Sequence, residues 1–296
     1  MHLTDLFSNI KLNEPMKNHT SFKVGGNADI FIEPDNANEL VEFIRYAKEN
    51  NIPYYIMGNG TNMLVSDEGI RGAVIKLGDK ISSVEVVDDK VIAQCGAKLP
   101  DVANIAAEYS LTGLEFACGI PGSIGGTVAM NAGAYESEMK DVVESVEVLD
   151  SNLQYKVLQS KEMEFGYRKS AISKHNYIVL GCTFKLKKGS KSDIKALMDE
   201  YTERRQNKQP LDMPSAGSIF KRPEGYYAGK LIEDAGLRGM TIGGAQVSEK
   251  HCGFIINKGD ATARDIYNLI KHIQKTIYER FGVKLETEVK LIGKFE

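Results

Sequence analysis

A glycine-rich stretch at residues 113–135 (GLEFACGIPGSIGGTVAMNAGAY) has the composition of a site for an anionic ligand. It contains six glycines, and almost all residues between them are small or apolar, whereas a flexible linker would be polar. Glycine in such surroundings allows close backbone packing or a positive φ. Successive backbone N–H groups in such turns form a concavity that binds anions. A tight structural turn would explain one glycine pair, but this density predicts a nucleotide or cofactor loop.

An earlier glycine loop has the sequence Gly58-Asn59-Gly60-Thr61-Asn62-Met63-Leu64-Val65. It offers backbone donors together with the side chains of Thr61 and Asn62. No Lys-Ser/Thr pair follows the glycines, so this is not a Walker A loop, and the G-x-G-x-x-G spacing of a Rossmann site is incomplete. Alone, the loop is ambiguous. Two such loops in one chain predict a site for a long ligand such as a dinucleotide.

Arg168 lies among aromatic residues in the segment FGYRKS, residues 165–170. An arginine in this position could clamp a carboxylate with two hydrogen bonds or stabilise an enolate. A surface arginine stacked on Tyr167 explains the same pattern, and the local sequence does not decide between these interpretations.

Ser218 follows small residues and precedes the bulky pair Ile219-Phe220 in the segment PSAGSIFKRP, residues 214–223. The small residues would let a ligand approach the hydroxyl group. The segment has no G-x-S-x-G elbow, which argues against an acyl-transfer serine. A turn serine that bonds the local backbone is the usual explanation of such a residue.

Glu286 and Glu288 alternate in an expected strand at residues 285–292 and would therefore share one face. Edge-strand glutamates that face solvent are the usual explanation. The three segments that carry Arg168, Ser218 and this pair of glutamates, together with three further residues, outline a site with several cationic groups and one acid, suited to an anionic substrate. The three further residues are Lys208, Lys230 and His251.

The elements expected to position these residues alternate helices and strands. A strand at 28–34, a helix at 38–50 and a strand at 53–57 form a β-α-β unit, which most often belongs to a parallel sheet with its ligand at the carboxyl ends of the strands. Further strands are expected at 72–77, 81–87, 90–95, 142–149, 153–158, 177–186, 254–257 and 285–292. Helices are expected at 100–109, 194–206, 228–235 and 261–281, and a loop at 211–225.

This order predicts an α+β protein with two domains. Residues 187–192 have the composition of a linker, which places the boundary after residue 188. The first domain, 1–188, is expected to have two lobes at about 17–75 and 76–188, and the second domain comprises 189–296.

Composition excludes several classes of protein. The chain has 296 residues, of which 42% are hydrophobic and 26% charged, as in soluble globular proteins. Its net charge of -3 gives no sign of binding to nucleic acid or an anionic membrane. The four cysteines are dispersed, which argues against a metal site or a disulfide framework. The polar N-terminal segment has no signal-peptide core and no membrane span is visible, so we expect a cytoplasmic protein.

Both glycine loops and the segments FGYRKS, SAGSIFKRP and LETEV occur in the order found in UDP-N-acetylenolpyruvoylglucosamine reductases (MurB). The chain resembles this family from about residue 17 to residue 293, and five separated motifs in register make the resemblance specific. It implies a vanillyl-alcohol-oxidase-type (PCMH-like) FAD-binding fold in two lobes, followed by a C-terminal α+β substrate-binding domain. The segment after Arg168 runs directly into Ser170, without the insertion that carries a substrate-covering tyrosine in one branch. The chain therefore resembles the shorter, type II branch.

The resemblance implies an NADPH-dependent UDP-N-acetylmuramate dehydrogenase. Such an enzyme reduces UDP-N-acetylglucosamine enolpyruvate to UDP-N-acetylmuramate for peptidoglycan, with hydride passing from NADPH to flavin N5 and then to the substrate. Ser218 matches the serine that protonates the substrate carbon, and Arg168 and Glu288 match the pair that stabilises the enolate-like intermediate. We hypothesise that Glu288 is protonated or shares a proton, since burial beside the flavin would favour this state.

The resemblance also implies the binding residues. Noncovalent FAD would contact residues of both glycine loops, namely Gly58, Asn59, Gly60, Thr61, Asn62, Met63, Leu64, Gly122, Ser123, Gly125, Gly126, Thr127, Asn131, Ala132, Gly133 and Tyr135. The substrate would contact Lys208, Arg222, Lys230 and His251. Arg222 stands where the other branch has an asparagine, and His251 where it has a glutamine. The implied partners are the sugar nucleotide and NADPH, with the protein a monomer or weak oligomer.

Two other functions fit parts of the same sequence less well. A flavin-dependent oxidase of the same fold, acting on an alcohol or sugar lactone, often attaches FAD through a histidine in the first glycine loop, and this loop has none. A nucleotide-binding regulatory or scaffold protein would not need Ser218, Arg168 and Glu288 in three separate segments.

Overall fold

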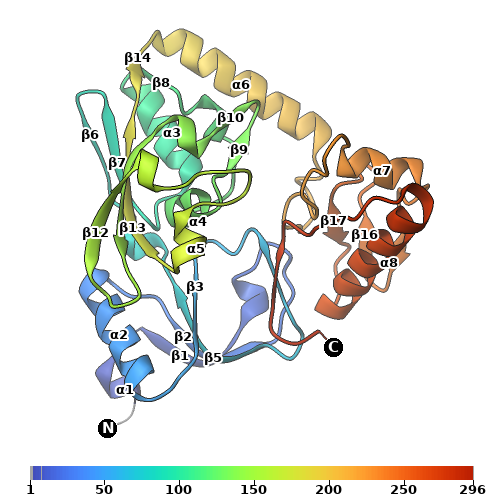
Figure 1. The fold of residues 1–296 in the computed structure, drawn as a ribbon, viewed down its shortest axis with the longest axis horizontal. Coiled ribbons are helices and arrows are strands. Elements are labelled where there is room, and N and C mark those ends of the chain that lie inside the picture. Colours follow the sequence, from blue (N-terminus) through green and yellow to red (C-terminus); the bar gives the residue numbers. More distant parts are fainter. Residues whose placement is uncertain (1–2, 8, 296) are drawn as a thin grey trace. The chain divides into compact units, whose positions relative to one another are not determined.

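A five-stranded antiparallel sheet in the order β12-β11-β13-β7-β6 dominates the first part of the computed structural model, which describes residues 3–7 and 9–295 (Figure 1). Apolar residues such as Val146 and Phe184 are fully buried in it. Strands β6 and β7 form an antiparallel hairpin, and Asp88 in its turn has a positive φ of 56°. The strands are β6 (Val84–Val87), β7 (Lys90–Gln94), β11 (Val143–Leu149), β12 (Tyr155–Gln159) and β13 (Ile178–Lys185).

Short helices pack beside this sheet (Figure 1). Gly125 lies in α4, and a Cβ added to it would come within 3.2 Å of the Cβ of Cys95. The missing side chain therefore lets the second glycine stretch approach the sheet closely. The helices of this part are α3 (Leu99–Glu108), α4 (Ile124–Ala129), α5 (Ala171–His175) and the start of α6 (Lys191–Lys208).

A second sheet has four strands in the order β1-β2-β5-β3. Helix α2 (Ala37–Glu49) begins at Asn36, whose side chain accepts hydrogen bonds from the backbone of Asn38 and Glu39. The elements of the expected β-α-β unit are confirmed, but β5 lies between its two strands. The strands are β1 (Ile10–Pro15), β2 (Asn27–Ile32), β3 (Tyr54–Met57) and β5 (Ile70–Lys76).

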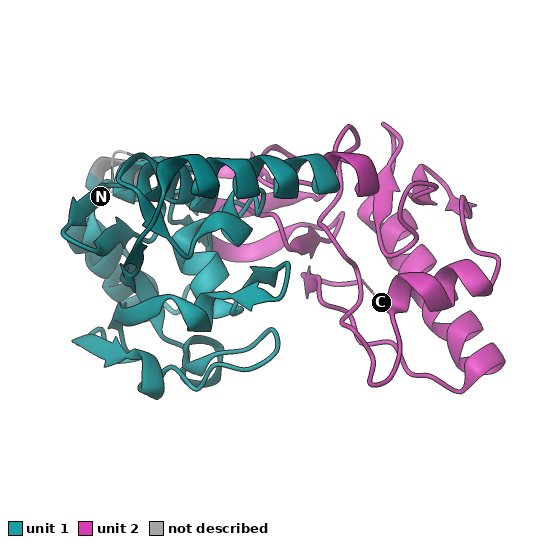
Figure 2. Ribbon diagram, turned by 90° about the horizontal axis from the view of Figure 1, so that it is seen from above, with its two compact units in different colours: residues 1–11, 31–59, 74–205 teal, residues 12–30, 60–73, 206–296 magenta. Residues whose placement is uncertain are grey.

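The chain divides into two compact units whose segments interleave (Figure 2). The first unit comprises residues 1–11, 31–59 and 74–205, and the second comprises 12–30, 60–73 and 206–296. Residues 187–192 are not an irregular linker, because Lys187–Lys188 forms β14, which pairs with β8 (Leu111–Thr112), and α6 follows directly. The division into domains after residue 188 stays a prediction.

The second unit has its own hydrophobic core. Helix α8 (Ala263–Phe281) begins with a capping box between Thr262 and Asp265 and ends at Gly282, whose φ is 69°. Its buried stripe packs against α7 (Ala228–Asp234) and a small sheet. The strands of that sheet are β15 (Thr241–Ile242), β16 (Ala245–Val247) and β17 (Ile255–Asn257). The helix and strand predictions for this core are confirmed.

The strand expected at residues 285–292 is wrong over most of its length. Only Lys290–Ile292 forms a strand, β18, which pairs in parallel with β4 (Met63–Val65). Residues 286–288 instead bond to a loop, since Lys221 N–H donates to the Glu286 carbonyl at 2.9 Å and Glu288 N–H donates to the Ile219 carbonyl at 2.8 Å. Glu286 and Glu288 therefore flank an isolated bridge between Thr287 and Phe220 and do not belong to a continuous strand.

The remaining short elements are α1 (Leu3–Leu6), β9 (Gly133–Ala134), β10 (Ser137–Glu138) and 3-10 helices at Met16–Asn18, Asp79–Ile81, Glu115–Ala117, Met139–Asp141 and Ser160–Glu162. The strand expected from residue 81 therefore begins later, at Val84. Within residues 3–7 and 9–295, no helix is long and apolar enough to cross a membrane.

Candidate active site

The segments that carry Ser218, His251 and Glu288 meet at Ile219 in the second unit. The Ile219 N–H donates to the carbonyl of Gly253 at 2.9 Å, and its carbonyl accepts from Glu288 N–H at 2.8 Å. The Ile219 side chain is fully buried in the core of this unit. Because both polar backbone groups and the side chain are held, Ile219 fixes three functional segments relative to one another.

Ser218 is exposed beside this anchor. It follows Gly217, whose φ of 73° is a conformation that side-chain-bearing residues rarely adopt. A Cβ added to Gly217 would meet no atom within 4 Å, and Ser218 itself forms an isolated bridge with Phe254. The serine hydroxyl is thus presented to open space from a fixed backbone.

Glu288 is half-buried, and its backbone is held on both sides. Its carbonyl accepts a hydrogen bond from Nδ2 of Asn62 at 3.2 Å, so one residue of the first glycine loop belongs to the same site. Glu286 differs, since it is exposed and pairs with Nζ of Lys221 at 3.1 Å. The sequence pattern treated the two acids alike, whereas the structure separates them.

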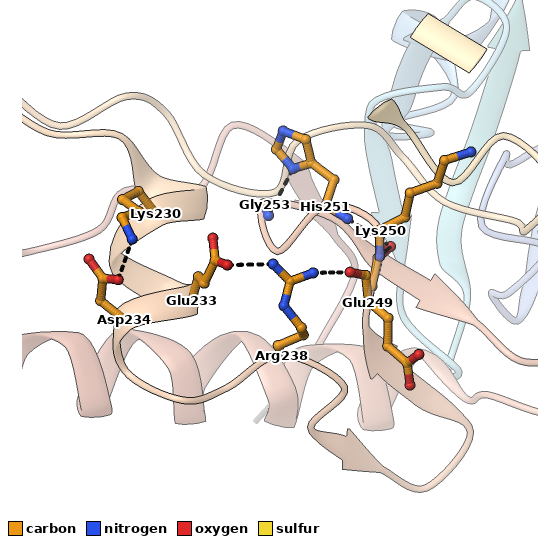
Figure 3. A network of polar contacts seen from close by, with 9 residues as sticks. Lys230, Glu233, Asp234, Arg238, Glu249, Lys250, His251 and Gly253 are labelled. Atoms are coloured by element: carbon orange, nitrogen blue, oxygen red, sulfur yellow. Dashed lines mark hydrogen bonds and ion pairs between the residues drawn. The ribbon is translucent and has the colours of Figure 1, made fainter. Parts of the chain in front are cut away.

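The other expected substrate residues of this unit lie on its surface. Lys208 is exposed at the end of α6, and Arg222 is exposed with its guanidinium 4.0 Å from the ring centroid of Tyr227. Nζ of Lys230 pairs with Asp234 at 2.6 Å along one face of α7 (Figure 3). Of these cations, Lys230 therefore has an internal partner that a ligand would have to displace.

His251 is held more firmly than the lysines. Its backbone N–H and that of Lys250 donate to the Ser248 hydroxyl at 3.3 and 3.2 Å, which closes the turn after β16. Its Nδ1 accepts from Gly253 N–H at 3.0 Å (Figure 3). Burial, with a smaller effect from the Arg238 charge, lowers the pKa of His251.

Arg168 lies in the first unit at the tip of a tight turn. Gly166 and Lys169 exchange both backbone hydrogen bonds, at 3.0 and 3.1 Å, and Arg168 has a positive φ of 54°. Its guanidinium lies 5.0 Å from the ring centroid of Tyr167 and reaches the Gly133 carbonyl at 3.5 Å. The stacking on Tyr167 is therefore present, and the same turn directs the guanidinium toward the second glycine stretch.

Asn131 anchors this turn to the second glycine stretch. Its fully buried side chain donates from Nδ2 to the Gly166 carbonyl at 3.1 Å and accepts at Oδ1 from Lys140 N–H at 2.9 Å. This expected cofactor residue thus positions the Arg168 turn through its Nδ2, while Lys140 N–H holds the other end of its amide.

We expect Asn131→Ala to lower the free energy of unfolding by about 2 kcal/mol, because it removes two hydrogen bonds made by a fully buried amide. Urea unfolding measures the change. Asn152→Ala is the control, since this exposed asparagine should change stability by less than about 0.5 kcal/mol. Equal losses for the two variants would contradict the anchoring role.

The second glycine stretch differs from the expected row of free backbone donors. The N–H groups of Gly122, Ile124 and Gly125 already donate to the carbonyls of Ile120, Ala97 and Cys95, at 2.9, 2.9 and 2.8 Å. The prediction that successive amides here form an anion cradle is therefore wrong for these three groups, because they hold α4 to its neighbours.

The group of this stretch that is left without a hydrogen-bond partner among the described residues is a side chain, that of Ser123. The Ser123 hydroxyl is buried, and among the described residues it has no hydrogen-bond partner. Gly58 faces it from the first glycine loop, so closely that a Cβ would lie 2.1 Å from the Ser123 oxygen. Thr127 is different, because its hydroxyl donates to the Ser123 carbonyl at 3.0 Å. The two glycine loops therefore meet at an unsatisfied polar atom.

Helix α6 covers the other end of the stretch. The rings of Tyr135 and Tyr201 stack with centroids 4.0 Å apart, and the Tyr135 hydroxyl donates to the Tyr201 carbonyl at 2.8 Å. Arg205 packs against Gly119, where a Cβ would lie 2.9 Å from its Cδ. Burial lowers the pKa of Arg205, and no ion pair to it occurs within residues 3–7 and 9–295. Nothing in the local sequence distinguishes Arg205 from its neighbour Arg204.

Three comparisons with known proteins extend over the same segments. Residues 28–153 match the model of an FAD binding domain, and residues 209–292 match the model of the UDP-N-acetylenolpyruvoylglucosamine reductase C-terminal domain. A relative named UDP-N-acetylenolpyruvoylglucosamine reductase, from Caldanaerobacter subterraneus subsp. tengcongensis, is 56% identical over 95% of this chain and 93% of its own. One of that name from Clostridium beijerinckii is 52% identical over 97% and 94%.

A solved structure agrees with these relatives. The crystal structure of UDP-N-acetylenolpyruvylglucosamine reductase (MurB) from Thermus caldophilus matches with a TM-score of 0.81 and 36% identity. The match covers 96% of this chain and 98% of that chain. The similarity therefore includes both units of the fold.

Proposed function

The chain belongs to the UDP-N-acetylenolpyruvoylglucosamine reductase family, and from this premise we propose how its residues divide the reaction between them. It is an FAD-dependent oxidoreductase that uses NADPH to reduce the enolpyruvyl group of UDP-N-acetylglucosamine enolpyruvate in peptidoglycan synthesis. The expected fold, cofactors and small-molecule substrates are confirmed. A cytoplasmic location and a monomeric or weakly oligomeric state remain proposals.

The first unit fits the cofactor. When bound, FAD would supply the two-electron chemistry that carries hydride between NADPH and the vinyl carbon of the substrate. The Ser123 hydroxyl offers a buried, unsatisfied donor, and Gly58 brings the first glycine loop into close contact with it. Both observations support noncovalent FAD. The further contacts proposed are Asn59, Gly60, Thr61, Asn62, Met63, Leu64, Gly122, Gly125, Gly126, Thr127, Asn131, Ala132, Gly133 and Tyr135.

A substitution at Gly126 tests FAD binding without disturbing the fold. It is exposed in α4, and a Cβ added to it would meet the Ser123 oxygen at an ordinary 3.6 Å. Alanine favours a helix over glycine by about 1 kcal/mol, so Gly126→Ala should not lower the Tm of the apoprotein. We expect Gly126→Ala to weaken FAD binding at least tenfold, which corresponds to about 1.4 kcal/mol, if the cofactor approaches this face of α4.

Fluorescence titration of the apoprotein with FAD measures this change. Gly58→Ala is the contrasting variant, because its Cβ overlaps the Ser123 oxygen at 2.1 Å and should reduce both stability and FAD affinity. Full FAD affinity in Gly126→Ala would show that no cofactor lies against Gly126.

For the chemistry, we propose that Ser218 donates the proton that completes the reduction. The observation that carries this role is the hydrogen-bonded Ile219, which holds the Ser218 segment beside Glu288 and His251. A serine hydroxyl is a poor acid, so it needs a strongly basic carbanionic acceptor, and hydride addition to an enolpyruvyl group creates one.

We propose that Arg168 and Glu288 stabilise the negative charge that spreads onto the substrate carboxylate after hydride addition. Groups preorganised in this way typically contribute about 3 kcal/mol each. Lys208, Arg222, Lys230 and His251 are the proposed contacts of the sugar nucleotide. Their positive charges and donors suit its phosphates and carboxylate.

An anaerobic titration tests the whole proposal. NADPH should bleach the absorbance of the holoenzyme near about 450 nm, and UDP-N-acetylglucosamine enolpyruvate should restore it. Recovery only with oxygen would indicate an oxidase instead. A protein that does not bind FAD would contradict the cofactor assignment.

A further inference from the structure

The imidazole of His251 is enclosed on three sides within the second unit. A Cβ on Gly229 of α7 would lie 3.3 Å from its Cε1, and a Cβ on Gly253 would lie 2.9 Å from the same atom. The ring of Phe254 meets it edge-on, with centroids 5.0 Å apart and planes at 67°. Two glycines and one aromatic ring therefore fix the orientation of the imidazole.

One backbone hydrogen bond selects the tautomer. Gly253 N–H points at Nδ1 of His251 at 3.0 Å, and a donor of this kind needs a lone pair on its partner (Figure 3). Nδ1 is therefore unprotonated, and the neutral ring carries its proton on Nε2. An imidazolium would oppose its own Nδ1–H to the Gly253 N–H. Burial and the Arg238 charge lower the pKa of His251 and so favour the same neutral state.

The charged groups near the imidazole come from two elements. Helix α7 carries Lys230, Glu233 and Asp234, of which Glu233 pairs with Arg238 at 2.6 Å (Figure 3). The turn that carries His251 adds Glu249, whose carbonyl accepts from Arg238, and Lys250, whose Nζ bonds the carbonyl of Gln206 at 2.5 Å. Neither Glu233 nor Glu249 is bonded to the imidazole, so no carboxylate there holds a second proton on the ring.

The same peptide links His251 to the proposed proton donor. The Gly253 N–H donates to Nδ1 of His251, and the Gly253 carbonyl accepts from the Ile219 N–H at 2.9 Å. Ser218 precedes Ile219 and pairs with Phe254 in the isolated bridge. Movement of the imidazole would therefore be transmitted to the backbone beside Ser218.

We infer that His251 is a neutral hydrogen-bond donor of fixed tautomer, whose Nε2–H binds an anionic oxygen of the sugar nucleotide, with Gly229 and Gly253 as positioning residues. The identity of the ligand rests on the proposed function. A glutamine amide also donates a hydrogen bond without carrying a charge. A histidine of fixed tautomer can therefore stand where the other branch of the family has glutamine.

Nitrogen NMR of the holoenzyme labelled with 15N-histidine tests the tautomer without any substrate. The chain has five histidines, and His251→Gln identifies the signals that belong to this ring. We expect an unprotonated Nδ1 and a protonated Nε2 at pH 7. A proton on Nδ1, or an imidazolium at that pH, would overturn the inference even if the enzyme reduces its substrate as proposed.

Ligand binding tests the donor. His251→Gln keeps a neutral donor and should bind UDP-N-acetylglucosamine within about threefold of the parent, whereas His251→Leu should bind at least tenfold more weakly. His175→Gln, in the first unit, is the control and should change nothing. Equal losses of affinity in His251→Gln and His251→Leu would overturn the donor role. Unchanged affinity in both variants would also overturn it.

A comparison of two ligands identifies the oxygen of the sugar nucleotide that accepts the hydrogen bond from His251. UDP-N-acetylglucosamine has phosphoryl oxygens but lacks the enolpyruvyl carboxylate. Equal losses in His251→Leu for this probe and for the KM of the enolpyruvyl substrate would assign the acceptor to the diphosphate. A loss confined to the enolpyruvyl substrate would assign it to the carboxylate. Failure of the parent enzyme to reduce that substrate would instead contradict the proposed function.

Gly229→Ala tests the positioning residues. Its Cβ would press on Cε1 of His251 at 3.3 Å and on the Gly253 nitrogen at 3.2 Å. We expect shifted His251 NMR signals and a KM for the sugar nucleotide that rises about tenfold, with a smaller change in kcat. Unchanged signals with unchanged KM would show that Gly229 does not position the ring.

Discussion

Ser218→Ala should lower kcat for enolpyruvyl reduction by about 10³-fold, within the 10²–10⁴-fold range of general acid catalysis. The variant loses the hydroxyl that we propose as proton source, whereas the backbone bonds of Ile219 that place residue 218 remain. Oxidation of NADPH in the absence of the sugar nucleotide needs no proton from Ser218 and should keep its rate. Stopped-flow absorbance under anaerobic conditions separates the two halves of the reaction.

Two further variants sharpen this result. Ser218→Cys keeps an ionisable hydrogen at the same position and should recover part of the lost rate. Ser215→Ala changes a serine of the same loop and should leave kcat within about twofold, since surface substitutions of this kind rarely exceed about 0.5 kcal/mol. If Ser218→Ala kept more than a tenth of the parent kcat, another group would have to supply the proton.

Strong periodicity made the helices of the second unit predictable. The apolar stripe of α8, which includes Ile266, Ile270 and Ile277, repeats at helical spacing and ends before Gly282. The expected helix at 261–281 differs from Ala263–Phe281 only at its start, where the Thr262 cap sets the boundary. Local signals were sufficient because this helix is defined by its own sequence.

Partners of irregular segments were not predictable in the same way. The alternation of Glu286 and Glu288 suggested a strand, yet residues 286–288 bond to the loop at 219–221. Period-two alternation shows which side chains could share a face, but it does not name the neighbouring chain. The strand therefore begins only at Lys290, where β4 is available as a partner.

The glycine stretch shows the same limit at the level of single atoms. Composition correctly indicated close backbone approach, as at Gly125 beside Cys95. It could not show that the amides of Ile124 and Gly125 are consumed by neighbouring carbonyls, leaving the Ser123 hydroxyl as the unsatisfied group. Which donors remain for a ligand depends on tertiary packing.

Arg205 was missed for a related reason. It follows Arg204 in a polar helix, and the sequence treats the two alike. Arg204 pairs with Glu200 at 2.9 Å and is exposed, whereas Arg205 packs against Gly119. Only the direction in which α6 docks on its neighbours distinguishes the two arginines.

Glu288→Gln should lower kcat by about 10²-fold, within the range observed when one preorganised group aimed at developing charge is removed. Glutamine has nearly the same shape, and the bonds of residue 288 to Ile219 and Asn62 involve its backbone, so the backbone should keep its place. The variant can donate a hydrogen bond but cannot give up or share a proton. Steady-state kinetics with NADPH and the enolpyruvyl substrate measure the loss.

Glu286→Gln provides the matched control, because it makes the same chemical change two residues away. That acid is exposed and pairs with Lys221 at the surface, an interaction worth about 0–1 kcal/mol, so kcat should stay within about twofold of the parent. The two variants have equal net charge and equal composition. A difference between them therefore arises from position alone. If Glu288→Gln kept most of its activity, a proton on Glu288 would have no part in the reaction, and stabilisation of the enolate would fall to Arg168 and the neutral donors of the site.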